Sequence, residues 1–466
     1  MLDTIISSVN TAMYSYVLII LLVGCGLYFT VRTKFAQFRL FGAQLRAVTE
    51  KPADGKGVSS FQALMVSTAS RVGTGNIIGV STALCLGGFG SVFWMWMIAI
   101  IGAASAFVES TLAQIYKRKG ENGCYGGPAY YIESALKCRS LAIVFSILLI
   151  LTYGVGFNML ASYNLQSTFS AYSFYNAKIT PWIIGLILAV LVGYCLMGGG
   201  KRVVKVTEVM VPVMGIAYIL IALSIVALNV TALPSVFARI FSEAFDLRAI
   251  FGGFGGSCVM YGIKRGLFSN EAGVGSAPNA SATAEVKHPV KQGLVQVLSV
   301  FIDTVLVCSA TAFMCMCSGV EPTEALSGAP YVQASLTATL GGFGPIFITV
   351  AMILFAFTTL LGNLYYVDQC LIHILGRVPK KAFWRSYYVI ASVLIFVGAG
   401  LSADLLWNIA DVTMGLMALI NIPVILFLGK YAFRALKDYE KQRKEGKAPE
   451  FHAKDIGLPH ETDYWK

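Results

Sequence analysis

The stretch SSFQALMVSTASRVGTGNIIGVSTALCLGG, residues 59–88, is long and apolar enough to cross a membrane, yet small and polar residues interrupt its middle. The interruption comprises Gly73, Thr74, Gly75, Asn76 and Gly79. Each glycine costs a helix about 1 kcal/mol relative to alanine, and glycine tolerates the backbone angles of an unwound turn. Broken backbone at membrane depth persists only where it is buried in protein or lines a wet cavity. The stretch therefore predicts a spanning helix that is broken next to a binding site.

A second stretch has the same character. IFGGFGGSCVMYGIKRG, residues 250–266, has four glycines, including Gly252 and Gly253, before Ser257. Close helix packing is the alternative explanation, because Gly75 and Gly79 also form a G-x-x-x-G pair. The positions of the two interruptions favour breaks. When the first span is set aside, they fall in spans one and six of the remaining ten, which is the layout of inverted-repeat transporters such as the leucine transporter.

Composition indicates a membrane protein. Of the 466 residues, 56% are hydrophobic and only 13% are charged, with a mean hydropathy of +0.71, whereas soluble domains carry roughly 25% charged residues. The net charge of +11 does not predict nucleic-acid binding, because the Lys and Arg residues lie between apolar runs, where they set topology. We expect an all-α polytopic membrane protein with about eleven spans, near residues 13–31, 60–86, 91–115, 141–166, 181–197, 206–228, 249–263, 293–318, 344–374, 387–401 and 405–428.

The distribution of basic residues predicts the orientation. With the N-terminus outside, most Lys and Arg residues fall in interior loops, and the exterior loop 319–343 has acidic residues but no base. This bias fits the positive-inside rule for an odd number of spans, with the C-terminus in the cytoplasm. The interpretation counts Lys264 and Arg265 among the interior residues. The first residues lack a basic segment and include Asp3, so we expect no cleaved signal peptide and a multi-pass protein of the cell membrane.

The predicted organisation has four parts. They are an N-terminal span with an amphipathic cytoplasmic segment (1–58), a first five-helix repeat (59–230), a second five-helix repeat (231–430) and a basic cytoplasmic tail (431–466). Together they predict a leucine-transporter-like 5+5 inverted repeat with one extra N-terminal helix. The ten cysteines lie mostly in apolar runs and lack the spacing of a disulfide framework or a zinc site.

Two helix breaks suit a zwitterionic ligand. The N-terminal end of a half-helix attracts a carboxylate, and carbonyl groups at the facing end suit an ammonium group or Na⁺. Thr358 and Thr359 lie side by side in the ninth span, LFAFTTLLGN. Together with backbone carbonyls near Ala69 and Val72, they predict an all-oxygen Na⁺ site. The alternative for both hydroxyls is a hydrogen bond to their own helix.

Four charged residues lie at or near membrane depth: Arg71, Glu109, Asp303 and Asp411. Buried charges in spans are costly and indicate functional sites by default. Because Arg71 adjoins the first break, we predict a gate ion pair with Glu109 or Asp303; a structural pair and the wall of a wet cavity are the alternatives. Neither glycine-rich break contains a carboxylate, which argues against a proton-binding site there.

No enzyme class is indicated. The chain has four histidines and no H-E-x-x-H, Walker A or G-x-S-x-G motif. A secondary transporter that works by alternating access is favoured, and coupling to H⁺ in place of Na⁺ is an alternative. A channel would need a continuous pore with rings of selectivity groups. A non-transporting sensor would need an output domain larger than the polar tail of about 35 residues.

Three motifs resemble signatures of the alanine or glycine:cation symporter family over nearly the whole chain. They are RVGTGNIIGV at 71–80, YGGPAYYIE at 125–133 and KRGLFSNEAGVGSAPNASA at 264–282. The resemblance implies an eleven-span bundle that imports a small neutral amino acid, alanine or glycine, with Na⁺ as the coupling ion. It also implies that Thr74, Gly75 and Asn76 face the substrate opposite Gly252, Gly253 and Ser257, with the cation near Ala69, Val72, Thr358 and Thr359.

Two positions depart from the pattern of that family. In GFNMLASYN, residues 156–164, Ala161 stands where a pocket glutamine is typical, and Asn363 stands where a pocket tryptophan is typical. Both changes predict a larger and more polar pocket, which would accept glutamine or serine. The expected partners are the amino-acid substrate and the lipid bilayer, with no nucleic acid and no obligate protein partner.

Overall fold

The computed structural model describes residues 8, 10–52, 57–120, 123–246, 257–458 and 462–465, and these are almost entirely helical. One short hairpin, β1 (Arg118–Gly120) and β2 (Gly123–Tyr125), is the exception within these ranges. The helices of the first half are η1 (Met13–Val17), α2 (Leu18–Arg32), α3 (Ala36–Arg39), α4 (Phe41–Thr49), α5 (Ser60–Arg71), η2 (Gly75–Gly79), α6 (Val80–Gly87), α7 (Gly90–Ile115), α8 (Pro128–Leu136), α9 (Arg139–Leu149), η3 (Ile150–Gly156), α10 (Phe157–Ser167), η4 (Thr168–Ala171), α11 (Thr180–Leu196) and α12 (Gly200–Leu228).

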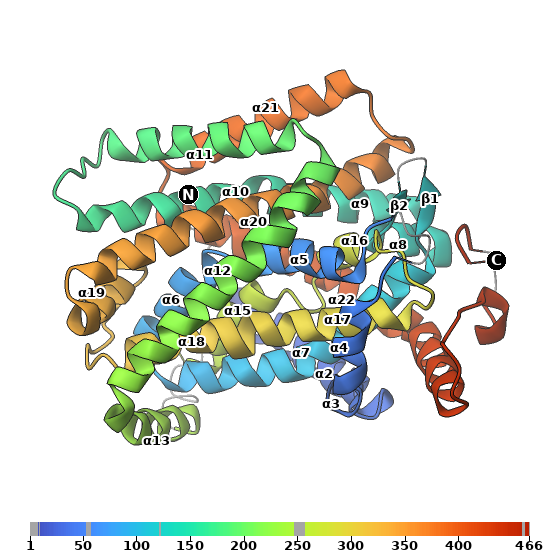
Figure 1. Ribbon diagram of the computed structural model, residues 1–466, viewed down its shortest axis with the longest axis horizontal. Coiled ribbons are helices and arrows are strands. Elements are labelled where there is room, and N and C mark those ends of the chain that lie inside the picture. Colours follow the sequence, from blue (N-terminus) through green and yellow to red (C-terminus); the bar gives the residue numbers. More distant parts are fainter. Residues whose placement is uncertain are drawn as a thin grey trace.

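The second half continues the helical pattern. Its elements are η5 (Val230–Ala232), α13 (Leu233–Ala244), α15 (Cys258–Asn270), α16 (Pro278–Ser281), α17 (Val290–Val300), η7 (Phe301–Cys308), α18 (Ser309–Met316), η8 (Glu324–Leu326), α19 (Ala329–Leu340), α20 (Phe343–Leu375), α21 (Lys381–Gly398), α22 (Ala403–Lys444) and η9 (Ala453–Ile456). The α13 end of the molecule and the C-terminal end lie opposite each other along its long axis (Figure 1).

Six continuous helical segments of the described residues are long and apolar enough to cross a membrane: 90–115, 139–171, 200–228, 290–316, 343–375 and 403–444. Three further apolar helical segments are shorter, at 18–32, 75–87 and 180–196. α11 and α21 lie side by side along one edge of the bundle (Figure 1). Their outward side chains, such as Leu186 and Ile390, are exposed and apolar, as expected of lipid-facing residues. The chain is therefore a multi-pass helical membrane protein.

The segment after α2 carries a row of exposed large apolar side chains. They are Phe35, Phe38, Phe41 and Leu45, and they fit the predicted amphipathic segment. The predicted span at 387–401 begins earlier than expected, since α21 starts at Lys381, and α22 continues without a break to Lys444. The tail beyond α22 packs against the bundle, because Phe451, Ile456 and Trp465 are all buried.

The first break lies within residues 72–74. α5 ends at Arg71, and helical structure resumes at Gly75 as a π-turn that continues into α6. The Asn76 side chain accepts a hydrogen bond from the Gly73 N–H at 2.8 Å, which satisfies a backbone group that the break leaves free. The glycines permit close contact with other helices: a Cβ on Gly75 would lie 2.6 Å from the Phe268 ring. A broken helix in this span agrees with the sequence prediction.

The predicted second break, with Gly252 and Gly253, lies outside the described residues. Ser257 is the N-cap of α15, where its hydroxyl accepts a hydrogen bond from the Met260 N–H. The helix interruption that faces the first break lies further along, at residues 271–277, between α15 and α16. Glu271 has a left-handed backbone conformation there, as do two glycines of the same loop.

The orientation argument also needs a correction. Lys264 and Arg265 are not loop residues, because both lie within α15, where the Asp411 carboxylate pairs with each of them. They belong to the half of the molecule that contains α13 and the start of α22. A buried carboxylate can hold two basic side chains at membrane depth, so these charges report an internal ion cluster and carry no information on loop topology.

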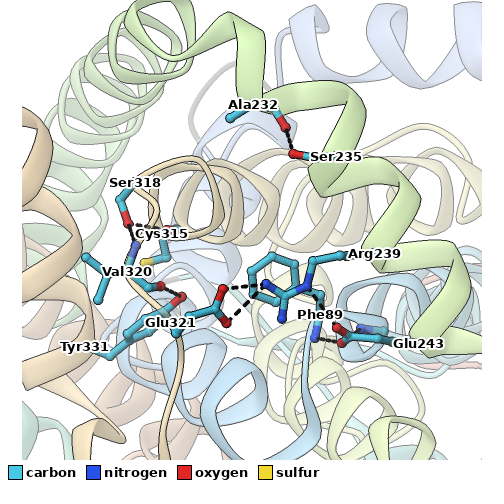
Figure 2. A network of polar contacts seen from close by, with 11 residues as sticks. Phe89, Ala232, Ser235, Arg239, Glu243, Cys315, Ser318, Val320, Glu321 and Tyr331 are labelled. Carbon is cyan, nitrogen blue, oxygen red and sulfur yellow. Dashed lines mark hydrogen bonds and ion pairs between the residues drawn. The ribbon is translucent and has the colours of Figure 1, made fainter.

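At the α13 end, a polar network fastens α13 to the beginning of α7 (Figure 2). The Glu243 carboxylate accepts hydrogen bonds from the backbone N–H groups of Phe89 (2.5 Å) and Gly90 (3.3 Å), the first residues of α7. The Arg239 guanidinium pairs with Glu243 and Glu321 and lies 3.9 Å above the Phe89 ring. Because Phe89 lies two residues beyond the end of α6, this network also fixes that end of the broken helix.

Candidate functional site

A small cavity of about 20 Å³ lies where the two breaks meet, which is about the space of one water molecule. Its wall combines the first break, the end of α15 and two packing helices, α10 and α20. The lining residues are Ser70, Arg71, Gly73, Thr74, Gly75, Phe157, Leu160, Ala161, Phe268, Glu271 and Thr359. Five of the predicted site residues therefore come together, and we call this space the central cavity: Arg71, Thr74, Gly75, Ala161 and Thr359.

The predicted Na⁺ site is only partly matched by the positions of the two threonines. The Thr358 hydroxyl donates to the carbonyls of Leu354 (3.0 Å) and Phe355 (3.2 Å) on its own helix, which was the alternative interpretation. The Thr359 hydroxyl is buried and has no hydrogen-bond partner. It lies against the first break, since a Cβ on Gly73 would be 2.1 Å from it. A buried hydroxyl oxygen at the end of a helix, where the last carbonyls have no intrahelical partner, has the chemistry that a small hard cation requires.

The two polar residues of the first break have different environments. Thr74 lines the central cavity, and its hydroxyl accepts a hydrogen bond from the Asn164 amide at 3.1 Å. Asn76 turns away from the cavity. Its amide donates to Asp303 Oδ1 at 2.6 Å and to the Ser269 hydroxyl at 3.1 Å. Asn76 therefore connects the first break to the end of α15 and to Asp303. It does not line the central cavity, where the sequence predicted it.

The side of the central cavity opposite the first break comes from the end of α15. Phe268 and Glu271 supply it, whereas Ser257 lies about three helical turns away at the start of the same helix. Ser257 therefore does not line the central cavity. The sequence does contain a signal for the true location: the motif at 264–282 has an acid followed by Gly273 and Gly275, both with positive φ. The run upstream of Ser257 contains more glycines, so the second break was predicted there.

Ala161 and Asn363 were both expected in the pocket, but only Ala161 lines it. The Asn363 side chain accepts a hydrogen bond from the Ser70 hydroxyl (2.6 Å) and donates to Asn158 (3.0 Å). It is fully buried between α5, α10 and α20. The neighbouring Gly362 lies against the Ser70 backbone, so the helices are too close there for a tryptophan side chain to reach the cavity unaltered. Asn363 thus acts one layer behind the pocket wall.

The predicted ion pair of Arg71 with Glu109 or Asp303 does not form. Arg71 donates to the Gln296 side chain at 2.9 Å, and it has no carboxylate within 4 Å among the described residues. Glu109 accepts instead from Asn421 (2.9 Å) and from the Gly273 N–H (3.3 Å). Uncharged hydrogen-bond donors therefore hold the carboxylates of Glu109 and Asp303. Arg71 interacts with both only at longer range.

Two clefts approach the central cavity from opposite ends. The cleft at the α13 end measures about 540 Å³, and its wall includes Arg265, Trp407 and Asp411. It is separated from the central cavity by the Phe268 ring, whose centroid lies 4.8 Å from that of Trp407. The cleft at the C-terminal end measures about 780 Å³ and reaches Val58, next to the start of α5. An internal site with a cleft on each side is the geometry that alternating access requires.

The arrangement fits reversible binding and not covalent chemistry. No group of three or more His, Cys, Asp and Glu side chains in the described ranges could hold a resident metal ion. Half-helix ends, an unpaired hydroxyl and buried charges surround the central cavity, as in helical secondary transporters that bind a substrate and a cation near the midplane. The fold and the site therefore define a secondary transporter.

The comparisons identify the family. Residues 1–453 match the sodium:alanine symporter family, to which the chain belongs. It is 46% identical over 447 residues to the amino-acid carrier protein AlsT of Bacillus subtilis (96% and 94% of the two chains), and 44% identical over 462 residues to the probable sodium/glutamine symporter GlnT of the same organism (98% and 95%).

The crystal structure of MhsT in complex with L-phenylalanine superposes with a TM-score of 0.53 at 14% identity, covering 87% of this chain and 92% of that one. That likeness shows a leucine-transporter-like fold. The chain is thus a sodium-coupled amino-acid symporter of alanine-type specificity and not an enzyme.

Proposed function

We propose that the chain imports a neutral amino acid through the central cavity, with Na⁺ bound beside it at Thr359. The unpartnered Thr359 hydroxyl, buried against Gly73, is the observation that carries this proposal. Free carbonyls near Ala69 and Val72, at the end of α5, complete the cation site. The substrate carboxylate faces the N-terminal end of the helix that begins at Gly75.

The proposed membrane arrangement follows the sequence. Eleven spans cross the cell membrane, with the N-terminus outside and the C-terminus in the cytoplasm. Residues 59–230 and 231–430 form two five-helix repeats, preceded by the extra helix in 1–58 and followed by the tail 431–466. The α13 end is then the outer end and the C-terminal end is the inner end. Reactivity of cysteines introduced singly at Lys178 and Arg377 towards an impermeant maleimide tests this: labelling of whole cells at the second position would overturn it.

Substrate range follows from Ala161. This small side chain lines the central cavity at a position where the family typically has a glutamine residue. It leaves room for a substrate with a longer polar side chain once the site opens. The relative named a probable sodium/glutamine symporter supports glutamine as a candidate. Competition of unlabelled alanine, serine and glutamine against labelled alanine uptake is the test. Glutamine should compete in the wild type and lose about tenfold in Ala161→Gln, a change that refills the space. Failure of glutamine to compete would limit the substrate to alanine-sized amino acids.

The Na⁺ site has its own test. Thr359→Val keeps the volume and removes the hydroxyl oxygen, so the apparent affinity for Na⁺ should fall at least about tenfold. Thr358→Val is the matched control, because the neighbouring hydroxyl is bonded to its own helix; its Na⁺ affinity should stay within about twofold. Equal effects of the two substitutions would contradict the assignment.

A further inference from the structure

Glu271 is an acid that the transport cycle described so far does not use. It is the only carboxylate among the described residues that line the central cavity, and it is 1% exposed. One of its oxygens accepts a hydrogen bond from the Ser276 hydroxyl at 2.7 Å, and the other lies 3.4 Å from the Ser70 hydroxyl, whose proton goes to Asn363. No Lys or Arg of the described ranges lies within ion-pairing distance of it. Hydroxyl donors lower the cost of a buried carboxylate but do not balance its charge.

Arg71 presents the opposite charge to the same cavity. Its Nη1 donates to Gln296, but its Nε and Nη2 are buried and have no hydrogen-bond partner. These two groups form one edge of the planar guanidinium, which matches the two oxygens of a carboxylate. Arg71 is 2% exposed, so the unpaired N–H groups are costly unless a ligand completes them.

The backbone around Glu271 favours a cation as well. The residue stands at the C-terminal end of α15, where the helix dipole adds partial negative charge, and its left-handed conformation ends the helix there. Each carboxylate oxygen has a further lone pair beside the hydroxyl contact, so Glu271 can still accept a hydrogen bond from a ligand. An ammonium group needs only an acceptor for each of its N–H bonds.

We propose that Glu271 and Arg71 together recognise the zwitterion, Glu271 binding the α-ammonium group of the substrate and Arg71 its carboxylate. The proposal rests on the proposed binding of the substrate in the central cavity. It makes both charged groups of an amino acid necessary for binding. A carboxylic acid or an amine of the same size satisfies one partner and leaves the other as an uncompensated buried charge.

The test uses purified protein in saturating Na⁺ and a scintillation proximity assay with labelled alanine, competed by propionate or ethylamine. Glu271→Gln keeps the shape and the hydroxyl contacts. It should weaken alanine binding at least about 30-fold while leaving propionate competition within about threefold. Glu109→Gln is the matched control, an equally buried glutamate that does not line the cavity; it should keep the preference for alanine over propionate.

Three results would overturn the proposal. One is alanine affinity in Glu271→Gln equal to that of the wild type. Another is an equal loss for alanine and propionate. The third is a loss of the thermal stabilisation by Na⁺ alone, which would make Glu271 a Na⁺ ligand. Ala161→Phe distinguishes a failure of the Glu271 and Arg71 proposal from a failure of the proposed substrate location. Filling the central cavity should abolish alanine binding whichever residues bind its charged groups. If Ala161→Phe also binds alanine normally, the proposed location of the substrate is wrong as well.

A second feature stands apart from substrate binding: the residues after α22 cover the inner end. The backbone of Val58, next to α5, pairs with Ala284 and accepts a hydrogen bond from the Glu285 N–H at 2.9 Å. Glu285 packs so closely against Gly57 that a Cβ there would lie 2.0 Å from its Cγ. These contacts join the first broken helix to the loop between α16 and α17, and they close the inner side of the site.

The tail holds that loop from outside. The Tyr464 hydroxyl donates to the Glu285 carboxylate, and the Phe451 N–H donates to the Lys287 carbonyl at 3.0 Å. The Trp465 indole donates to the Gln114 carbonyl at 2.8 Å. Between them the Lys117 ammonium lies 3.8 Å from the centre of the Tyr464 ring and donates to the Ala284 carbonyl at 2.8 Å.

The geometry points to a C-terminal latch: residues 447–458 and 462–465 hold the inner gate closed and must loosen before the substrate is released. Cys124 is a native reporter, since its thiol is buried against Glu285 at 3.0 Å. In inside-out vesicles Trp465→Ala should raise the rate at which maleimide labels Cys124 about tenfold. Cys124→Ser gives the background from other cysteines. Lys447→Ala removes an exposed side chain of the same tail and should change the rate less than twofold. A normally folded Trp465→Ala protein with the wild-type labelling rate would overturn the latch.

Discussion

At the α13 end, the proposed outer end, side chains alone separate the cleft from the central cavity. At the C-terminal end, the proposed inner end, two backbone segments pair and a third part of the chain covers them. The outer barrier consists of the Phe268 and Trp407 rings with the Arg265–Asp411 pair beside them. The inner barrier joins Val58 to Ala284, under a tail in which Trp465 is only 7% exposed. Rotamer changes suffice to open the first, but the second requires packed segments to separate.

The difference bears on the transport cycle. A barrier of side chains opens with small motions, so the outer end suits frequent capture of substrate from a dilute medium. A barrier of paired backbone and buried aromatic rings opens more rarely. If both ends opened with equal ease, Na⁺ and substrate would leak through states that couple them poorly. The comparison predicts that single substitutions of a few residues at the outer end have large effects. At the inner end, substitutions of several residues should each have a small effect.

The largest effect is expected from Asp411→Asn. Asp411 is 1% exposed and is shared by Lys264 (2.9 Å) and Arg265 (3.3 Å). Removing its charge leaves two nearly buried cations uncompensated, which costs about 3–5 kcal/mol of stability. Thermal unfolding followed by fluorescence-detected size exclusion measures the loss. An unchanged melting temperature would show that the pair contributes little and that the outer barrier does not depend on it.

Trp407→Ala should have the next largest effect. The ring lies 4.8 Å from that of Phe268, and the Arg265 guanidinium lies 4.1 Å above it. Its loss should cost about 1–3 kcal/mol and should speed the release of alanine to the outer side about tenfold, measured as efflux from right-side-out vesicles. Trp407→Phe retains a ring and is the control. Equal efflux rates in the two variants would mean that Phe268 closes the outer side unaided.

At the inner end, Lys117→Met should have a smaller effect. The ammonium group is fully buried, and it joins the Ala284 carbonyl to the Tyr464 ring. Methionine preserves the length of the side chain but not the hydrogen bond or the charge, at a cost of about 1 kcal/mol. Cys124 labelling in inside-out vesicles should rise a few fold. Lys119→Met, on the exposed side of the neighbouring strand, should not change it. A larger effect here than for Asp411→Asn would reverse the comparison of the two ends.

Sequence patterns predicted the helical class and the first break well, because both depend on local composition. A spanning stretch with three glycines in seven residues, Gly73 to Gly79, has few ways to fold in a membrane. The glycine run before Ser257 is the stronger local signal, and its glycines lie outside the described residues. The interruption that the structure describes begins at Glu271, which is left-handed although it is not a glycine, so local composition did not predict it.

The sequence predicted only part of the face that the broken helix turns to the cavity. Thr74 and Gly75 line the cavity as expected, whereas Asn76, one residue later, faces Asp303. Which side of a broken helix faces the cavity is decided by the helices that pack on it, and spacing along the chain does not encode that choice. The pair of Arg71 and Glu271 comes from two helices 200 positions apart and was visible only once both breaks had been located.

The smallest effect should come from the exposed part of the α13 network, which sharpens the comparison by its contrast with Asp411. The Glu321 side chain is 71% exposed and pairs with Arg239 at 2.9 Å (Figure 2). Solvent screening leaves such a pair at most about 0.5 kcal/mol, so Glu321→Gln should shift the melting temperature barely measurably. Glu243→Gln should cost more, because this carboxylate also caps the start of α7 through the Phe89 N–H. Equal shifts for the two substitutions would show that α13 is held by its ion pairs and not by the cap. The stability of the outer end would then depend on exposed ion pairs as much as on Asp411.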